Sequence, residues 1–330
     1  MNLPTRIEVV TLGECLASLV AATPGPLADA IAFERHIAGA EANVAVGLTR
    51  LGHSVAYVGR VGGDGFGTAI VRRLRGEGVD VGHVAVDPDA GTGVMIRERR
   101  ALAAAEVLYH RARSAASRLA PEDIDRAVDA GLFDGARWLH VTGITPALSA
   151  TARAATIRAR DVAREAGLMV SLDINLRRRL WSDAAAGPTL RDLATGVDAI
   201  LGSKDELAVI ADADPAADPA ELAAIVATLG PSTVVVKLGS AGALGLEAGA
   251  TPVLVPALWV PVVVDPVGAG DGFCAGFIAG RLDGVDLETA LRMGNACGAL
   301  VVAAVGDQAG LPDRDELGRL LAGGGADTLR

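Results

Sequence analysis

The chain has 330 residues, of which 51% are hydrophobic and 21% are charged, so its composition is that of a folded globular protein and excludes disordered and fibrous classes. Its net charge of −10 would repel a phosphate backbone, which argues against nucleic acid as a partner. The three cysteines are far apart and odd in number, which argues against a disulfide framework and a cysteine-based zinc site.

The sequence shows no pattern of membrane insertion or export. The uncharged stretch 248–264 is shorter than the roughly 20 residues that a spanning helix needs, and it contains three prolines. The N-terminal segment lacks the layout of a signal peptide. We therefore expect a cytoplasmic protein with no membrane partner.

Short β-branched runs alternate along the chain with longer amphipathic stretches, a pattern typical of a parallel sheet with helices on both faces. The predicted strands are 7–12, 55–61, 138–142, 169–173, 199–201 and 233–237. The predicted helices are 43–51, 67–77, 121–133, 151–166 and 221–229. The pattern indicates an α/β sandwich.

Two regions, residues 14–37 and 90–112, break this alternation. They contain the short strand-like pieces 31–37, 93–97 and 106–111 without intervening helices. We expect these pieces to form a small antiparallel sheet that acts as a lid on the main one. No linker or repeat divides the chain, so the prediction is a single domain over residues 1–330.

Several common chemistries are excluded by motif. No Gly-Lys dipeptide occurs, so a Walker A loop is absent, and no two histidines stand at i, i+4 as in zincin metal sites. No Gly-x-Ser-x-Gly elbow occurs, which weakens an α/β-hydrolase interpretation. The turn 268–272 has the wrong glycine spacing for a dinucleotide fingerprint, so a nicotinamide enzyme is the weaker interpretation.

Residues 262–280 carry the strongest chemical signal. An apolar run meets the turn Gly268-Ala-Gly270, and a helix with small residues follows, so backbone amides and the helix dipole would form an anion site. The negative charge of Asp271, directly after this turn, is unfavourable for phosphate binding. It has a purpose if Asp271 acts as a base on the group that attacks the phosphate. The pattern therefore predicts phosphoryl transfer; the alternative is that Asp271 only caps the helix.

Residues 265–273, Asp-Pro-Val-Gly-Ala-Gly-Asp-Gly-Phe, resemble the C-terminal signature of the ribokinase-like (PfkB) carbohydrate kinases. Residues 38–52 and 58–67 resemble the N-terminal signature of the same family in order and spacing. The resemblance implies a ribokinase-like three-layer α/β/α sandwich with a mostly parallel central sheet and a small β-sheet lid. It also implies transfer of the ATP γ-phosphate to a sugar hydroxyl.

Within the family, segments 107–111, 139–149 and 173–177 are similar to members that phosphorylate 2-keto-3-deoxygluconate on its terminal hydroxyl, giving the 6-phosphate. A carboxylate substrate needs planar cations, and Arg111 and Arg177 stand where that pattern has arginines. Either arginine could instead be a surface charge. The alternatives are a fructokinase, a ribokinase or a 5-dehydro-2-deoxygluconokinase, and, further away, a non-catalytic sugar or nucleotide sensor.

The resemblance assigns roles to individual residues. Asp271 matches the catalytic base, and the amides of Gly268 to Gly270 match the anion hole. The positions that match the substrate site are Gly39, Ala40, Asn43, Tyr109, Arg111, Arg177 and Asp271. The positions that match the ATP site are Asn175, Ser203, Lys237, Gly239, Ser240, Gly242, Gly268, Ala269, Gly270 and Asn295.

The resemblance also implies ions and a mode of assembly. Mg²⁺ is expected to arrive with ATP, mostly hydrated, and Glu206 matches an acidic position that contacts its water shell. A monovalent cation is expected near Asp265. The partners are a small sugar acid and ATP, and pairing of lid strands between subunits would give a homo-oligomer.

Overall fold

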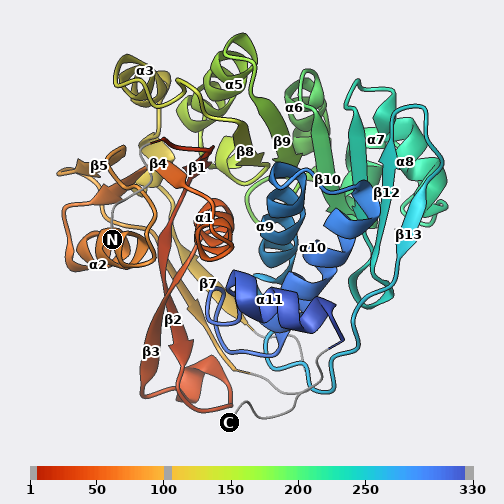
Figure 1. Ribbon diagram of the computed structural model, residues 1–330. Coiled ribbons are helices and arrows are strands. Elements are labelled where there is room, and N and C mark those ends of the chain that lie inside the picture. Colours follow the sequence, from red (N-terminus) through yellow and green to blue (C-terminus); the bar gives the residue numbers. More distant parts are fainter. Residues whose placement is uncertain (1–5, 100–105, 324–330) are drawn as a thin grey trace.

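The computed structural model describes residues 6–99 and 106–323, so residues 100–105 of the predicted lid region 90–112 lie outside the description. Figure 1 shows a large central sheet with helices on both faces and a smaller sheet projecting from one end. The central sheet has nine strands in the order β13-β12-β11-β10-β9-β8-β1-β4-β5. The smaller sheet has the order β3-β2-β6-β7.

The central sheet is parallel except at β12, which runs antiparallel to both neighbours. Its strands are β1 (Val9–Gly13), β4 (Val55–Gly62), β5 (Val84–Asp87), β8 (Trp138–Thr142), β9 (Met169–Asp173), β10 (Ala199–Ser203), β11 (Thr233–Lys237), β12 (Ala243–Glu247) and β13 (Val253–Val255). All six predicted strands are present. The three others, the short edge strands β5 and β13 and the antiparallel β12, were not among the predicted strands.

Alternate residues of each strand enter separate hydrophobic cores on the two faces, as a period of two requires. On β11, Val234 and Val236 lie in one core and Val235 lies in the other. The helices of the first core are α3 (Pro121–Asp129), α5 (Ala150–Glu165), α6 (Asp183–Ala194), α7 (Lys204–Ala211) and α8 (Pro219–Ala227). Those of the second are α1 (Ala40–Arg50), α2 (Gly65–Gly76), α9 (Ala269–Leu282), α10 (Leu287–Val302) and α11 (Arg314–Leu321).

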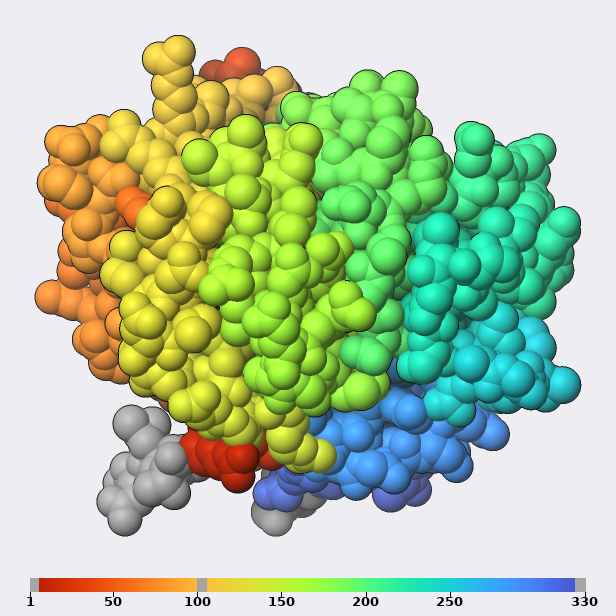
Figure 2. Space-filling view, turned by 90° about the horizontal axis from the view of Figure 1, so that it is seen from above, coloured from red at the N-terminus to blue at the C-terminus, as the bar shows by residue number. Residues whose placement is uncertain are grey.

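These layers confirm the predicted α/β/α sandwich. Figure 2 shows the molecule from above, with the layer that contains α3, α5 and α6 facing the viewer. All five predicted helices are present, with ends shifted by a few residues except for α3, which ends at Asp129 rather than at residue 133. Within the described part of the chain, no helix is both long enough and apolar enough to cross a membrane. All three cysteines are buried and free.

The lid sheet consists of β2 (Leu16–Ala21), β3 (Phe33–Ala38), β6 (Val94–Arg97) and β7 (Val107–His110). The prediction of a purely antiparallel lid is wrong, because β2 and β6 pair in parallel. The chain between these two strands passes through α1, β4 and α2, and such a long crossover lets it return in the same direction. Strand β2 was also not predicted, because it follows β1 almost directly.

Helices α1 and α9 pack side by side across one face of the sheet, and both begin at the end that faces the lid (Figure 1). Small residues allow this close approach. A Cβ atom on Gly47 would lie 2.6 Å from Cβ of Ala275. The N-termini of the two helices are therefore held next to each other.

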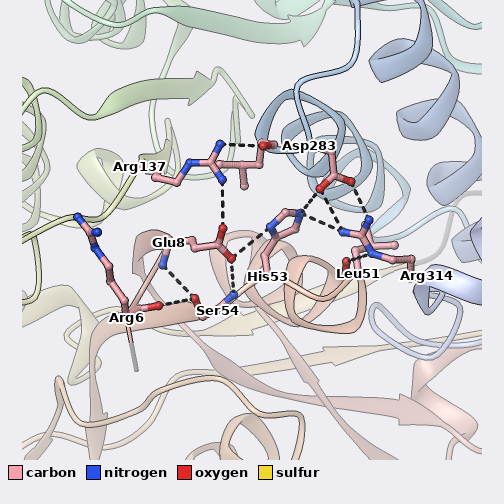
Figure 3. Close-up of polar contacts among 9 residues, drawn as sticks. Arg6, Glu8, Leu51, His53, Ser54, Arg137, Asp283 and Arg314 are labelled. Atoms are coloured by element: carbon pink, nitrogen blue, oxygen red, sulfur yellow. Dashed lines mark hydrogen bonds and ion pairs between the residues drawn. The ribbon is translucent and has the colours of Figure 1, made fainter. Parts of the chain in front are cut away.

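A polar network fixes the other ends of these helices (Figure 3). His53, after α1, lies 3.4 Å from a carboxylate oxygen of Glu8 and 3.6 Å from one of Asp283, which follows α9. Arg314 donates to the carbonyl oxygen of Leu51 at 2.7 Å and to Asp283 at 2.8 Å. With both ends held, the first turns of α1 and α9 are fixed in relation to the sheet.

Candidate active site

A cavity of about 480 Å³ lies between the lid and the carboxyl ends of the central strands. In parallel α/β sheets this edge is where ligands bind. Larger hollows, of about 570 and 630 Å³, lie at α6 and α7 and beside β7, but neither is lined by Asp271 or by the glycine turn before it. We therefore place the candidate active site in the cavity under the lid.

The cavity brings together most of the residues that the sequence predicted. All of the predicted substrate-site residues line it: Gly39, Ala40, Asn43, Tyr109, Arg111, Arg177 and Asp271. The predicted ATP-site and magnesium residues in its wall are Asn175, Ser203, Glu206, Lys237, Gly239, Gly268 and Gly270. The predicted residues that do not line it are Ser240, Gly242, Asp265, Ala269 and Asn295.

Asp271 lies in the first turn of α9 and is only 7% exposed. Its two carboxylate oxygens accept hydrogen bonds from Asn43 Nδ2 at 2.8 Å and from Asn175 Nδ2 at 3.3 Å. The N-cap of α9 is Gly268, without a side-chain cap, so the alternative that Asp271 caps the helix is wrong. Burial raises the pKa of Asp271, although the Asn43 hydrogen bond and the charge of Arg177 oppose this. A fixed carboxylate with a raised pKa suits a general base.

The turn before Asp271 depends on a glycine. Gly268 has a φ of 83°, and a Cβ atom there would lie 2.7 Å from the carbonyl oxygen of Asp307. The turn places Gly268 and Gly270, at the N-terminus of α9, in the cavity wall. Backbone amides at a helix N-terminus and the helix dipole suit an anion, and the predicted anion site stays a prediction.

A second polar group spans the ends of β9 and β11. Lys237 Nζ donates to Asp173 Oδ1 at 2.7 Å, and Asn175 Nδ2 lies 3.2 Å from Asp173 Oδ2. Burial alone would lower the pKa of Lys237, but the charge of Asp173 outweighs it, so the pKa is raised and the ammonium persists. Asp173 therefore holds a cation at the cavity wall near Asp271.

The two predicted arginines differ in their surroundings. Arg111 forms an ion pair with Glu14 and lies over the ring of Tyr109, 5.5 Å from its centre. Glu14 is buried and also accepts from Ser114 Oγ at 2.6 Å. Arg177 is exposed, and its guanidinium has no hydrogen bond or ion pair within residues 6–99 and 106–323, although its carbonyl oxygen accepts from the amide of Leu180 at 2.8 Å. The prediction missed Glu14, although an acid directly after a buried strand was a usable signal.

Ser203 and Glu206 form a capping box at the start of α7. Glu206 accepts from the amide of Ser203 at 2.8 Å and from that of Leu176 at 2.9 Å, which holds its carboxylate in the cavity wall. A carboxylate held in this way fits contact with a hydrated Mg²⁺ through water. Within the described residues, no group of three or more His, Cys, Asp or Glu is arranged to hold a metal ion.

Asn295 and Gly242 shape the segment after β13 instead of lining the cavity. Asn295 Nδ2 donates to the carbonyl oxygens of Val255 at 3.1 Å and Pro256 at 3.2 Å. Gly242 packs against the same segment, where a Cβ atom would lie 2.0 Å from the Val255 oxygen. Their predicted contacts with ATP stay predictions.

Asp265 lies directly behind the glycine turn and is buried. It accepts from Arg97 at 2.5 Å, from the amide of Gly306 at 3.1 Å and from that of Val267 at 3.2 Å. Asp307 beside it lines the cavity, and burial raises its pKa to about 7. The prediction assigned no role to Arg97 or Asp307, which reach this place from segments without a motif.

Comparison with known proteins identifies the relatives of this chain. Residues 6–314 match the model of the pfkB family carbohydrate kinases. The chain is 38% identical to the 2-dehydro-3-deoxygluconokinase of Bacillus subtilis, over 96% of both chains. It is 40% identical to that of Thermoproteus tenax, over 96% of this chain and 94% of the other. It is 33% identical to the 2-dehydro-3-deoxygalactonokinase of Haloferax volcanii, over 98% of this chain and 99% of the other.

Solved structures agree with these relatives. The 2-dehydro-3-deoxygluconokinase of Thermotoga maritima superposes with a TM-score of 0.85 at 27% identity, over 96% of this chain and all of that one (100%). A putative ribokinase II from E. coli, in complex with ATP and Mg²⁺, has a TM-score of 0.86 at 27% identity. A fructokinase from Vibrio cholerae with fructose, ADP and potassium bound has a TM-score of 0.81 at 27% identity. Both alignments cover 96% of this chain and 99% of the other.

Proposed function

Because the chain belongs to the pfkB family of carbohydrate kinases, we propose that it transfers the γ-phosphate of ATP to the terminal hydroxyl of 2-dehydro-3-deoxy-D-gluconate, giving the 6-phosphate. The observation that carries this choice of substrate is the guanidinium of Arg177, which lies in the wall of the same cavity as Asp271 and has no hydrogen bond or ion pair with the described residues. A sugar acid brings a carboxylate that an arginine can bind with two hydrogen bonds. A neutral sugar does not need this cation.

The proposed step uses the geometry around Asp271. The carboxylate takes the proton of the terminal hydroxyl while that oxygen bonds to the γ-phosphorus, and the bond from the γ-phosphorus to the bridging oxygen breaks to release ADP. Asn43 and Asn175 hold the carboxylate in place. The amides of the Gly268 turn and the N-terminus of α9 stabilise the charge on the phosphoryl group.

The remaining cavity residues would hold the two substrates. Lys237 is a protonated cation beside Asp173 and suits contact with the ATP phosphates. Mg²⁺, when bound with ATP, would neutralise phosphate charge, and Glu206 would accept hydrogen bonds from its waters. We place the reaction in the cytoplasm, where ATP is present. Assembly of the chain into a homo-oligomer stays a prediction.

The experiment measures ADP release by the purified protein with ATP and Mg²⁺ on several acceptors. These are 2-dehydro-3-deoxygluconate, its galactonate epimer, fructose, ribose and 5-dehydro-2-deoxygluconate. We expect the highest kcat/KM on 2-dehydro-3-deoxygluconate. A higher value on the galactonate epimer would correct the stereochemistry only. A higher value on fructose or ribose would overturn the sugar-acid proposal, and no turnover on any sugar would favour a sensor.

A matched pair of arginine variants tests the carrying observation. Arg177→Ala should lower kcat/KM for the sugar acid by about ten- to a hundredfold, because a charged hydrogen bond is worth roughly 1.5–3 kcal/mol. Arg178→Ala is the control, since Arg178 is exposed and bound to Asp183 outside the cavity. It should change kcat/KM less than twofold. Equal losses in the two variants would remove Arg177 from substrate binding.

A further inference from the structure

Arg97 connects the lid to the loop behind the anion site. It is the last residue of lid strand β6, and its side chain is almost completely buried, at 5% exposure. Its terminal nitrogen lies 2.5 Å from Asp265 Oδ2, and Asp265 begins the segment that leads to the Gly268 turn. The same nitrogen lies 3.9 Å from Asp307 Oδ1. A fixed cation is therefore buried between two carboxylates behind the anion site.

The surroundings of the anion site contain more negative than positive charge. Asp265, Asp271 and Asp307 are all less than 10% exposed and lie around the turn that must hold a phosphoryl group. Their charges oppose the binding of an anion, and a buried carboxylate needs a cation or hydrogen bonds to stay ionised. Arg97 supplies one positive charge directly to Asp265. The charge of Arg97 also acts to lower the pKa of Asp307, against the effect of burial, which raises it.

The family resemblance implies a monovalent cation near Asp265, and the related fructokinase from Vibrio cholerae has potassium bound. The residues of this chain do not fit such an ion at Asp265. Both of its carboxylate oxygens already accept hydrogen bonds, from Arg97, Val267 and Gly306. A guanidinium has the same charge as a monovalent cation and is planar, so it can bond to the carboxylate and satisfy the charge that an ion would satisfy.

We propose that the guanidinium of Arg97 replaces a monovalent cation at Asp265, so that this kinase works without potassium. Arg97 touches no reacting atom, and it acts by positioning the 265–268 loop and offsetting its carboxylates. The charge is covalently part of the lid, because Arg97 belongs to β6. The inference rests on the kinase activity of the family and not on the identity of the sugar, so it is tested with whichever acceptor turns over best.

The first measurement compares the wild-type enzyme in potassium, sodium and tetramethylammonium chloride at equal ionic strength. Tetramethylammonium is too large for a potassium site, and equal ionic strength keeps screening constant. We expect kcat/KM to change less than twofold among the three salts. An activation of fivefold or more by potassium alone would overturn the proposal, because it would show that an ion still binds.

The second measurement removes the guanidinium. Arg97→Ala should lower kcat at least tenfold, and millimolar guanidinium or potassium should restore part of the loss, because either ion can enter the space left beside Asp265. Urea has a similar shape and no charge, so it should restore nothing. The matched control is Arg60→Ala, which removes another arginine paired with buried aspartates, Asp87 and Asp123, outside the cavity. Neither ion should stimulate this control.

Thermal unfolding gives a readout that does not depend on turnover. A ligand that binds the folded state raises Tm, whereas guanidinium in general lowers it. Millimolar guanidinium should therefore raise the Tm of Arg97→Ala and leave that of the wild type and of Arg60→Ala unchanged or lower. Loss of activity without rescue by either ion, and without a rise in Tm, would make Arg97 a merely structural residue and overturn the proposal.

A conservative variant keeps the test decisive if Arg97→Ala does not fold. Arg97→Lys retains the charge but loses the planar fork. It should fold, turn over more slowly than the wild type and remain insensitive to potassium. Activation of Arg97→Lys by potassium would overturn the proposal, because a charge already present at Asp265 should exclude the ion.

Discussion

The floor of the cavity, formed by the carboxyl ends of the central strands and the first turns of α1 and α9, holds its functional side chains differently from the lid sheet β3-β2-β6-β7. On the floor, β8 is buried along its whole length, and only the first residue of β9 is exposed. In the lid, three of the four residues of β7 are exposed, and the apolar cluster of the lid consists of Leu16, Ala38 and Met95 with Val107 packed against them. Two ion pairs join the lid to the floor, Arg97 with Asp265 and Arg111 with Glu14.

This difference separates chemistry from recognition. Phosphoryl transfer needs fixed geometry, and the packed floor supplies it by holding Asp271 between two asparagines. Binding and release of a sugar need a surface that opens, and regions with few buried apolar contacts open at low free energy. Changes on the floor should therefore alter kcat or stability. Changes in the lid should mainly alter KM, except at Arg97, whose side chain contacts the loop behind the anion site.

The largest expected effect comes from the floor. Asp271→Asn removes the base but keeps the shape of the side chain, so kcat should fall on the order of 10²–10⁴-fold. The KM for ATP should stay nearly unchanged, because the amides of the Gly268 turn are still in place. Steady-state kinetics with varied ATP measures both values. Asp205→Asn, on the exposed start of α7, is a control that should leave kcat unchanged.

Unchanged turnover in Asp271→Asn would remove the base from the mechanism. A loss in kcat together with a large rise in the KM for ATP would mean that Asp271 positions the nucleotide. Either result would weaken the assignment of chemistry to the floor. The distinction between floor and lid would then rest on stability alone.

A pair of core truncations tests the distinction through stability. Leu172 is fully buried on β9, so Leu172→Ala should lower the free energy of unfolding by about 2–5 kcal/mol. Met95 lies in the small lid cluster beside the cavity, where neighbours can close the space, so Met95→Ala should cost less than about 1.5 kcal/mol. Denaturant unfolding measures the loss of stability in each variant. Met95→Ala should in addition raise the KM for the sugar several-fold. Equal losses of stability would show that the lid and floor unfold as one rigid unit.

The sequence predicted the floor better than the lid for the same physical reason. Strands 138–142, 169–173 and 233–237 are predicted with the observed bounds, because strands buried on both faces are rich in apolar residues over their whole length. The turn at Gly268 was predicted because its backbone geometry requires glycine. Local patterns of this kind are properties of one segment.

The lid depends on pairings between segments far apart in the chain. No pattern in one segment indicates that Arg111 pairs with Glu14, or that Arg97 reaches Asp265. The prediction therefore found Arg111 but not its partner, and it missed Arg97 and the parallel pairing of β2 with β6. Charged residues are common in any chain, and only the fold shows which of them meet.

A buried acid on the floor plays no part in the proposed step but should make stability depend on pH. Glu41, in the first turn of α1, is fully buried and accepts from Thr142 Oγ1 at 2.7 Å and Thr145 Oγ1 at 2.6 Å. Burial raises its pKa from 4.5 to about 7, and the two threonine hydrogen bonds only partly oppose this. The folded protein therefore holds a proton on Glu41 at a pH where the unfolded chain has lost it.

The sign of the pH dependence follows from this difference in bound protons. Stability falls with rising pH wherever the folded state binds more protons than the unfolded state. For Glu41 the fall begins near the unfolded pKa of 4.5 and is complete above about 7, with a total on the order of 3 kcal/mol. Glu41→Gln keeps the shape and the acceptor oxygen for the threonines but cannot ionise. Its stability should therefore decline less between about pH 5 and 8.

Thermal unfolding of both proteins across this pH range measures the effect. Glu122→Gln, at an exposed position of α3, is the matched control and should retain the full wild-type decline. Asp307 has a raised pKa of about 7 and adds a decline of its own, so the Glu41→Gln curve should flatten in part and not completely. Identical pH dependence in Glu41→Gln and the wild type would mean that Glu41 is ionised in the folded protein. The first turn of α1 would then carry a buried charge whose hydrogen-bond donors are neutral hydroxyls, unlike Asp173, which is paired with Lys237.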